Sequence, residues 1–457
     1  MAVFCRKFAY FMAFLLFFQL NSASAAGLIR DTEVETVFQD AVQLMAEEAG
    51  FPDGIQIRII VDPTYNAFVV GGKTIYIHTG LLFSARSAEE ILGVIAHEIG
   101  HLASGHAALR QEAVNDSNLA TALTAIASAA VAATGSAEAA VGVAIGGTDR
   151  AKRQYLSTSR KDESVADQWA LRLLDKAGIS SYGLTDFMRR QASQRLLPQG
   201  RQSEYYTTHP GAKERLATFT EHTDQILEER ALSQSQHQSL ARTVLKLAAY
   251  TQPPSPTKYA EFQLDWTSSS SNPAKIVPDE TSLTYARAIA LFRRGALDEA
   301  DKLMSELVNK NKSDAWLAEF AGDIDMSAGR PFQAATHYRK ALLLRPDSPQ
   351  ISLSLGRALI ATNDKALLDD AIEVLLTAEK GEPKWGFVKR QLAIAYGRNG
   401  RLADADVTLA EEALLAKDKP RATQMAKRAL SNKSAPDDVK AKAKDILFQL
   451  NIPATID

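Results

Sequence analysis

The sequence Val94-Ile-Ala-His97-Glu98-Ile-Gly-His101 contains two histidines four residues apart, with a glutamate directly after the first. On an α-helix, residues at this spacing lie on one face, so both imidazoles can reach a single metal ion. Histidine is scarce in the chain, with 8 in 457 residues, so chance alone seldom produces this pattern. The spacing predicts one zinc ion (Zn²⁺) bound by His97 and His101, with Glu98 as the general base that takes a proton from water.

The residues around this motif predict that it lies inside an amphipathic helix. Ser87-Ala-Glu-Glu90 has the spacing of a capping box, so we expect a helix to begin there. The apolar side chains that follow recur at helical spacing, at Ile91, Leu92, Val94, Ile95 and Ile99. The alternative is a packed helix whose two histidines and glutamate lie on the protein surface and bind no metal.

A second acidic stretch, Ser159-Arg-Lys-Asp-Glu163-Ser-Val-Ala-Asp167, begins another predicted helix. A catalytic zinc site usually has three protein ligands and one water, so we expect Glu163 to be the third ligand. Asp167 lies one turn later on the same face, where its carboxylate can accept a hydrogen bond from the second ring nitrogen of a ligand histidine. The alternative is that these charges only favour the N-terminal dipole of their helix.

The stretch Thr207-Thr-His209-Pro210, followed by Arg215, supplies the remaining candidates for the site. A residue before proline has extended backbone, from which His209 can project into a cleft. There it can stabilise the oxyanion of a tetrahedral intermediate, or occupy the fourth zinc position until substrate displaces it. Arg215 can serve the same oxyanion or brace the loop, and the alternative for His209 is a turn residue that caps the next helix. His106 lies about 140° around the helix from His101, so we do not expect it to be a ligand.

The composition is that of an ordinary globular protein with two or three domains. The chain is 46% hydrophobic and 23% charged, and its formal net charge is −2. A protein that binds nucleic acid needs a basic face, and nothing in the sequence indicates one. We therefore expect no nucleic-acid partner.

Residues 1–26 have the organisation of a secretory signal peptide. Arg6 and Lys7 precede an almost entirely apolar run from Phe8 to Leu20, and Ala23-Ser-Ala25 is a small-x-small cleavage pattern. The apolar run is short for a membrane span, although an uncleaved N-terminal anchor is the alternative. The one cysteine, Cys5, lies before the run, so the mature chain would have no cysteine and would hold a metal through histidine and carboxylate.

Between the signal peptide and the zinc motif, the pattern changes from helix to strands. Residues 30–50 have helical periodicity, and Ile55 to Val61 reads as a strand. Residues 66–72 and 73–78 read as two further strands that meet at a pair of glycines. If the first of these lies at the sheet edge near the zinc, its residues can bind an extended peptide substrate by strand addition, with the contacts at Asn66, Ala67 and Phe68. The alternative is a hairpin that belongs only to the core.

Residues 119–147 are dominated by alanine, glycine and small polar residues, with Glu138 as the one charge. Alanine contributes little to membrane insertion, so we expect two close-packed helices or a mobile lid over the cleft rather than a span. The composition also allows shallow, peripheral contact with a membrane.

The C-terminal third repeats a helix-turn-helix pattern with the period of tetratricopeptide repeats. Gly295 and Gly329 are 34 residues apart, and each is followed five residues later by an alanine. The register returns at Asn363, with a three-residue insertion, and at Gly400. Such arrays form a concave binding surface, and the alternative is an unrelated helical bundle. Proline- and serine-rich residues 250–280 would connect the array, residues 281–457, to the domain before it, residues 27–249.

Taken together, these motifs resemble those of the M48 family of zinc metallopeptidases. The zinc helix is His97-Glu98-Ile-Gly-His101, the third-ligand motif is Glu163-Ser-Val-Ala-Asp167, and the strand-and-turn signature is Asn66 to Gly72. The histidine–proline loop is His209-Pro210 with Arg215. The order of the four signatures matches the family, and the repeats are similar to those of its periplasmic members. Such members carry a cysteine pair near the C-terminus that this chain lacks.

The resemblance implies an α+β protein, in which a mostly helical zincin-type peptidase domain with a small β-sheet precedes an all-α repeat solenoid. It also implies a secreted, periplasmic endopeptidase that degrades misfolded or stalled outer-membrane proteins. Its substrates would be unfolded or misassembled proteins, and the repeats would contact either these clients or the outer-membrane assembly machinery. The alternative is a largely latent peptidase that acts through its repeats as a periplasmic chaperone or scaffold.

Overall fold

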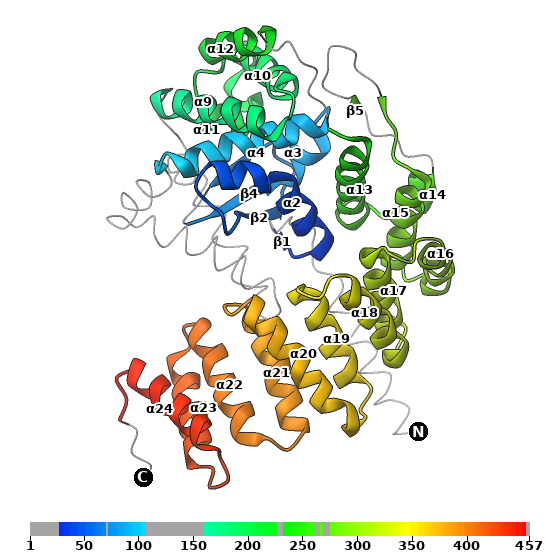
Figure 1. Cartoon of the computed structure of the whole chain (residues 1–457), viewed down its shortest axis with the longest axis vertical. Coiled ribbons are helices and arrows are strands. Elements are labelled where there is room, and N and C mark those ends of the chain that lie inside the picture. Colours follow the sequence, from blue (N-terminus) through cyan, green and yellow to red (C-terminus); the bar gives the residue numbers. More distant parts are fainter. Residues whose placement is uncertain are drawn as a thin grey trace.

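The computed structural model describes residues 27–69, 72–106, 160–225, 232–260, 266–267 and 275–453. Within them, a mostly helical part surrounds a small β-sheet, and a curved array of helical hairpins follows it (Figure 1). The predicted class, an α+β domain followed by an all-α repeat array, is confirmed. The predicted signal peptide, residues 1–26, and the alanine-rich segment, residues 119–147, lie outside the described residues.

The sheet has four strands in the order β1-β2-β4-β3. Strands β2 and β4 are parallel, and the other two pairs are antiparallel. The bounds are β1, Gly27–Ile29; β2, Gln56–Val61; β3, Ala67–Val69; and β4, Thr74–His78. Ile57 and Ile59 of β2 point to one buried face, as the two-residue period of a strand requires. Strand β3 lies at a sheet edge, one of the two arrangements that the sequence left open, and β1 was not predicted.

Two helices pack beside this sheet and fix the position of the zinc motif. Helix α2, Thr32–Glu48, begins at Asp31, whose carboxylate accepts the backbone N–H of Val34. Helix α4, Ala88–Ala103, contains the motif and begins at Ser87, whose hydroxyl accepts the N–H of Glu90. The predicted capping box is only half right, because the Glu90 carboxylate accepts the backbone N–H of Arg86 instead of reaching back to Ser87.

Among the remaining helices of this part, α9 and α10 pack directly against α4. The bounds of the remaining helices are α3, Thr79–Ser84; α9, Arg160–Ala177; α10, Tyr182–Ser193; α11, Glu204–Thr208; and α12, Ala212–Asp224. The 3₁₀ turns Gln194–Leu196 and Gln199–Arg201 connect α10 to α11. Helix α4 is buried along almost its whole length, so a cluster of polar side chains on it lies in the interior.

The repeat array consists of five helical hairpins. Their helices are α15, Glu280–Arg293; α16, Leu297–Lys310; α17, Ala315–Ser327; α18, Pro331–Leu344; α19, Pro349–Ala361; α20, Leu368–Gly381; α21, Gly386–Arg398; α22, Leu402–Leu415; α23, Lys419–Ser431; and α24, Asp437–Gln449. The four predicted turn residues Gly295, Gly329, Asn363 and Gly400 all have positive φ. The predicted insertion after Asn363 forms a 3₁₀ turn, Lys365–Leu367.

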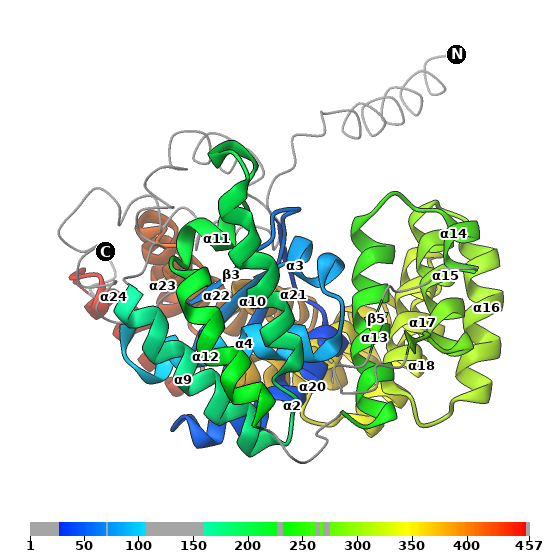
Figure 2. The same ribbon diagram turned by 90° about the horizontal axis from the view of Figure 1, so that it is seen from above.

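Helix α13, Gln234–Thr251, belongs to the cores of both parts. Leu240 and Val244 pack in the core of the sheet and α4, whereas Leu245 and Ala249 pack against α15. Figure 2 shows α13 between α2 and α15. The segment that follows contains α14, Pro256–Ala260, and two short paired strands, β5, Trp266–Thr267, and β6, Lys275–Ile276.

The concave side of the array contacts the start of α2 directly. The Thr32 hydroxyl lies 2.8 Å from Glu319 Oε1 and 2.8 Å from Gln350 Oε1, and Arg30 Nη2 lies 2.6 Å from Glu382 Oε1. These contacts join segments that lie far apart in the chain. No helix within the described ranges is both long and apolar enough to cross a membrane.

Candidate metal centre

Helix α4 places His97 and His101 on one face, one turn apart. Both side chains are almost fully buried, and their Nε2 atoms lie 3.1 Å apart. The rings are nearly perpendicular, with 4.7 Å between their centroids. Two imidazole nitrogens therefore point into the same small volume, as the spacing predicted.

A close helix contact brings the third residue to this volume. A Cβ atom on Gly100 would lie 2.6 Å from the carbonyl oxygen of Ala166, so only glycine lets α9 approach α4 this closely. Glu163, near the start of α9, then lies with Oε2 3.4 Å from His97 Nε2 and Oε1 3.3 Å from His101 Nε2. The glycine inside the zinc motif is thus a packing requirement for the site.

The residues present fit a tetrahedral metal ion. Zinc–nitrogen and zinc–oxygen bonds of about 2.0–2.1 Å place neighbouring ligand atoms of a tetrahedral site about 3.3 Å apart. The three separations between His97, His101 and Glu163 are 3.1, 3.4 and 3.3 Å. Together with His209, these residues form a fully buried cluster in which one ligand atom from each lies within 4.8 Å of the others.

His209 is the fourth member of the cluster. It lies at the C-terminal end of α11, where its backbone N–H donates to the carbonyl of Tyr205 at 2.9 Å. Its Nδ1 lies 3.1 Å from Glu163 Oε1, and its Nε2 lies 3.6 Å from Glu98 Oε1. The structure therefore brings the predicted histidine–proline loop against both Glu163, the predicted third ligand, and Glu98, the predicted general base.

Asp167 and Arg215 support the ligands from behind. Asp167 Oδ1 lies 3.0 Å from Nδ1 of His97, the ring nitrogen that faces away from the cluster. Arg215 donates to both oxygens of Asp167 at 2.6 Å and to Glu163 Oε2 at 2.5 Å. Its guanidinium therefore fixes both carboxylates of α9.

The predicted substrate strand, β3, packs against α4, the helix that carries His97 and His101. Ala67 and Phe68 pair with Ile77 and Tyr76 of β4, which leaves the other edge of β3 without a neighbouring strand among the described residues. Asn66 is fully buried, and neither atom of its side-chain amide has a hydrogen-bond partner in the described part of the chain. Tyr205 donates its backbone N–H to the Tyr65 carbonyl at 3.2 Å, so α11 is tied to the start of β3.

Comparison with known proteins identifies the domain that carries this cluster. The sequence profile of peptidase family M48 matches residues 30–223, which contain all of the residues described above. These residues form a peptidase family M48 domain. The predicted resemblance, an M48 metallopeptidase followed by tetratricopeptide repeats, is confirmed.

Several curated proteins are similar to this chain over more than the M48 domain. The beta-barrel assembly-enhancing protease of Yersinia pestis is 21% identical over 348 residues, which cover 76% of this chain and 69% of that protein. The protein of that name from Escherichia coli strain K12 is 24% identical over 304 residues, 66% of this chain and 59% of the relative. The chain thus matches less than two thirds of the Escherichia coli protein. Metalloprotease YcaL from the same strain is 29% identical over 161 residues, 35% of this chain and 59% of that protein.

Two solved structures are similar to part of the chain. MamA 41-end from Desulfovibrio magneticus RS-1 has 22% identity and a TM-score of 0.30, and the match covers 37% of this chain and 97% of that one. A thermophilic TPR protein from Thermus thermophilus has 18% identity and a TM-score of 0.24, with 37% of this chain and 99% of that one covered.

The charges around Glu163, the predicted third ligand, favour its ionised carboxylate. Burial raises the pKa of Glu163, but the charges of His209 and Arg215 outweigh this effect, and its pKa lies well below the usual range. Burial likewise raises the pKa of Asp167, and Arg215 and His97 bring the net value below normal. Burial lowers the pKa of His101 well below its ordinary value, which keeps its nitrogen unprotonated and free to bind a metal.

His97 differs from His101 because two carboxylates of α9 face it. Burial alone would lower its pKa, but the hydrogen bonds and charges of Asp167 and Glu163 raise the pKa to about 9. A metal ion bound at Nε2 would replace the proton there, and Asp167 would still hold the proton on Nδ1.

Two residues of the M48 domain contact the cluster although the sequence analysis did not place them in it. The ring of Tyr205 stacks on His209, with 4.2 Å between centroids, and its buried hydroxyl has no hydrogen-bond partner within the described ranges. A tyrosine four residues before a histidine has no sequence signal that separates it from a core residue. His106 lies with Nδ1 3.0 Å from Nδ1 of His101, outside the ligand cluster, as expected.

Proposed function

We propose that the chain is a zinc-dependent endopeptidase of the periplasm that cleaves misfolded or stalled outer-membrane proteins. The observation that carries the proposal is the convergence of His97, His101 and Glu163 at separations that suit a tetrahedral zinc ion. The names of the curated relatives support the class of client, because they describe proteases that enhance β-barrel assembly. The pattern of residues 1–26 supports export.

Zinc held by His97, His101 and Glu163 would supply a Lewis acid that makes water a stronger nucleophile and polarises the scissile carbonyl. Glu98 is buried directly beside these ligands and accepts the proton of the attacking water. It then gives this proton to the nitrogen of the leaving amine. Asp167 holds the ring of His97 in place, and Arg215 holds Asp167 and Glu163.

The substrate would bind as an extended strand along the edge of β3. An added strand there pairs with the backbone of Ala67 and Phe68, which gives affinity without selecting a sequence. Asn66 has amide atoms without partners in the described chain, and these can bind the backbone of the peptide beside the metal. Broad acceptance of unfolded segments suits a protease for misassembled clients.

His209 gives the site a resting arrangement in which cleavage is restrained. Catalytic zinc sites keep one position open, whereas sites with four protein ligands are closed. His209 lies within the ligand cluster and bonds to Glu163, so it can fill the fourth position until substrate displaces it. After displacement, its ring remains near Glu98 and can stabilise the oxyanion.

The position of His209 in the ligand cluster also favours a second candidate. This is a largely latent peptidase that serves as a periplasmic chaperone or scaffold. In that case the repeats would bind clients or the outer-membrane assembly machinery, and His209 would keep the metal closed. Complementation of a strain that lacks the gene separates the two functions, since Glu98→Gln removes cleavage and leaves the repeats intact.

The direct test is casein cleavage by the purified chain beside Glu98→Gln and His209→Ala, with Lys213→Gln as a surface control near His209. The proposal expects weak cleavage by the unaltered chain, none by Glu98→Gln, and faster cleavage by His209→Ala. Slower cleavage by His209→Ala would assign that residue to oxyanion stabilisation alone. Normal cleavage by Glu98→Gln would overturn the assignment of the general base.

A further inference from the structure

A cavity of about 260 Å³ lies where the concave side of the repeat array faces the start of α2 and the end of α13. On the side of the array, its walls come from the first helices of the first four hairpins, α15, α17, α19 and α21. It is separate from the metal centre, because none of the metal-cluster residues lines it.

Two carboxylates one helical turn apart face this cavity. Glu319 and Asp323 lie on the same face of α17, and both are only partly exposed. Each has one oxygen bound by a neutral hydroxyl: Thr32 donates to Glu319 at 2.8 Å, and Tyr338 donates to Asp323 at 2.6 Å. Burial raises the pKa of Glu319 to about 8 and that of Asp323 to about 6, against the weaker opposing effect of Lys246.

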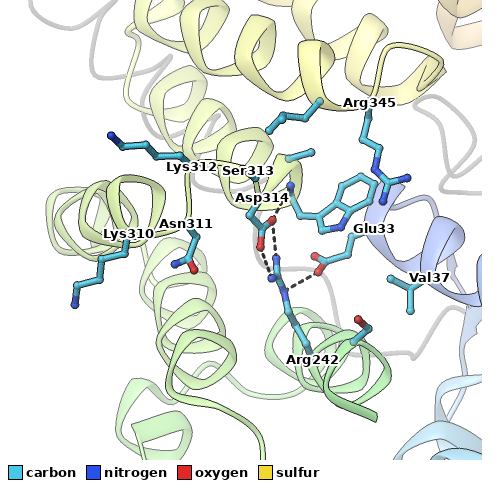
Figure 3. Close-up of a pocket in the computed structure, with 13 residues that line it drawn as sticks. Glu33, Val37, Arg242, Lys310, Asn311, Lys312, Ser313, Asp314 and Arg345 are labelled. Carbon is cyan, nitrogen blue, oxygen red and sulfur yellow. Dashed lines mark hydrogen bonds and ion pairs between the residues drawn. The ribbon is translucent and has the colours of Figure 1, made fainter. Parts of the chain in front are cut away.

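The cations near the cavity already have other acidic partners. Lys246 lies 2.8 Å from Asp31 and 3.1 Å from Glu33, and Arg30 lies 2.6 Å from Glu382. Arg242 is held between Glu33 and Asp314 in the adjoining hollow of about 680 Å³, as Figure 3 shows. Among these three cations, none is paired with the two carboxylates of α17.

A fourth cation, Arg357, lies at the cavity and opposes part of this negative charge. It lines the cavity from α19, and its guanidinium lies over the ring of Phe387 at 5.6 Å. Its side chain is exposed, so water screens its attraction for Asp323. Three cations and three carboxylates line the cavity, but within the described residues no cation forms an ion pair with Glu319 or Asp323.

The rest of the wall is aromatic and contains a free hydroxyl. Tyr285, Trp316, Phe320, Trp385 and Phe387 line the cavity from the array, and Tyr250 lines it from α13. Tyr285 is 1% exposed, and its hydroxyl makes no hydrogen bond to any described residue. Arg30 and Arg357 already lie over the rings of Trp385 and Phe387, so the aromatic wall is not the reason to expect a cation. The buried Tyr285 oxygen without a partner, however, favours a ligand that donates hydrogen bonds.

We propose that this cavity binds the basic side chain, lysine or arginine, of an extended segment in a client or partner protein. The ammonium or guanidinium group would donate to Glu319, Asp323 and the Tyr285 hydroxyl, while its aliphatic stem lies against Trp385 and Phe387. A neutral or acidic side chain would leave both carboxylates without a cation. The repeats would thus select clients by positive charge, whereas the edge of β3 accepts any extended backbone.

The test measures peptide binding to the full chain carrying Glu98→Gln, so that cleavage does not interfere. The probes are three fluorescein-labelled glycine–serine decapeptides that differ only in two central residues, which are lysines, glutamines or glutamates. Fluorescence anisotropy should show the tightest binding for lysine, weaker binding for glutamine and none for glutamate. A fourth decapeptide with two central arginines tests the other basic side chain. It should bind at least as tightly as the glutamine peptide.

The matched protein variants locate the binding. Glu319→Gln with Asp323→Asn keeps an oxygen to accept from Thr32 and Tyr338, and should weaken lysine-peptide binding roughly tenfold, the usual scale for charge-assisted bonds. The control, Glu373→Gln with Asp437→Asn, removes the same charge from exposed sites and should bind normally. Tyr285→Phe should weaken binding by a smaller factor, whereas Tyr259→Phe, outside the cavity, should not.

Equal binding of lysine and glutamine peptides would overturn the proposal, as would full lysine-peptide binding by the cavity variant. Either result is independent of the proposed protease activity, since cleavage of casein by the unaltered chain is measured separately. A variant that fails to fold is recognised by thermal unfolding, and the comparison of lysine and glutamine peptides on the unaltered cavity still decides the question.

Discussion

Arg215 and Asp167 form a buried, two-bond ion pair in which Nε and Nη2 of the guanidinium each lie 2.6 Å from one carboxylate oxygen. Arg215 also contacts Glu163 at 2.5 Å, so one side chain orients both Asp167 and Glu163. Such a geometry is specific to arginine, because an ammonium group cannot form parallel bonds to a carboxylate.

Replacing Arg215 should damage both stability and metal binding. Arg215→Gln leaves two buried carboxylates without their cation, a change that costs about 3–5 kcal/mol in other proteins. Loss of the group that orients metal ligands typically lowers metal affinity about 10- to 100-fold. Urea unfolding and zinc titration measure the two effects. The matched control is Arg189→Gln, whose exposed pair with Asp186 should contribute well under 1 kcal/mol. A zinc affinity unchanged in Arg215→Gln would contradict this role.

The packing of α9 on α4 predicts an unusual result for Gly100→Ala. Alanine normally stabilises a helix interior by up to about 1 kcal/mol relative to glycine. At Gly100, however, the new Cβ would lie 2.6 Å from the backbone of Ala166, so α9 must move and carry Glu163 away. We expect a loss of about 1–3 kcal/mol together with weaker zinc binding.

Gly397→Ala is the control for that substitution. It also lies in a helix, but its Cβ would meet only Ala405, at an ordinary 4.0 Å. Thermal unfolding should show a small gain in stability for Gly397→Ala and a loss for Gly100→Ala. If both variants gain, the helix contact does not depend on the glycine.

The ring of Tyr205 should affect cleavage, whereas its hydroxyl should contribute little to protein stability. Its hydroxyl has no partner in the described chain, so Tyr205→Phe should leave the unfolding free energy almost unchanged. Tyr65→Phe makes the contrast, because it removes a 3.0 Å bond to Glu90 and should cost about 1 kcal/mol. Tyr205→Leu removes the stack that holds His209 and should change casein cleavage in the same direction as His209→Ala. An opposite change would show that the stack does not position His209.

Glu319 should make the stability of the protein depend on pH. Its pKa is raised to about 8 in the folded chain from an ordinary value of 4.5. The contribution of Glu319 to the free energy of unfolding is therefore fully present below pH 4.5 and is lost as the pH rises through 8. Glu319→Gln removes this dependence. The stability advantage of the glutamine variant should therefore grow between these pH values, by at most about 1.4 kcal/mol per pH unit, and then level off. Glu373→Gln should show no such trend, and a constant difference for Glu319→Gln would contradict the raised pKa.

The sequence predicted the helix that carries His97 and His101 because its signals are local. The cap at Ser87, the apolar spacing and the two histidines all lie within one helix and describe its face without help from the rest of the fold. The turn residues of the array are predictable for the same reason, since glycine and asparagine tolerate the positive φ that those turns need.

The parts that were missed depend on residues far away in the chain. Glu90 was expected to complete a capping box, but its carboxylate is also bound by Tyr65 and Arg190, which the fold brings to it. Strand β1 has only three residues and too little pattern to be recognised. Glu319 resembles any exposed helical glutamate in sequence, and only its contact with Thr32, 287 positions earlier, reveals the cavity.

The central claim is that His97, His101 and Glu163 hold a zinc ion in the M48 domain. Its most direct test is the metal content of the purified full chain, measured by elemental mass spectrometry after dialysis. The same measurement is made on Glu163→Gln and on the exposed control Glu373→Gln. We predict one zinc per chain in the unaltered protein and in the control, and a large loss in Glu163→Gln. No bound zinc in the unaltered protein, or equal zinc in all three, would contradict the account.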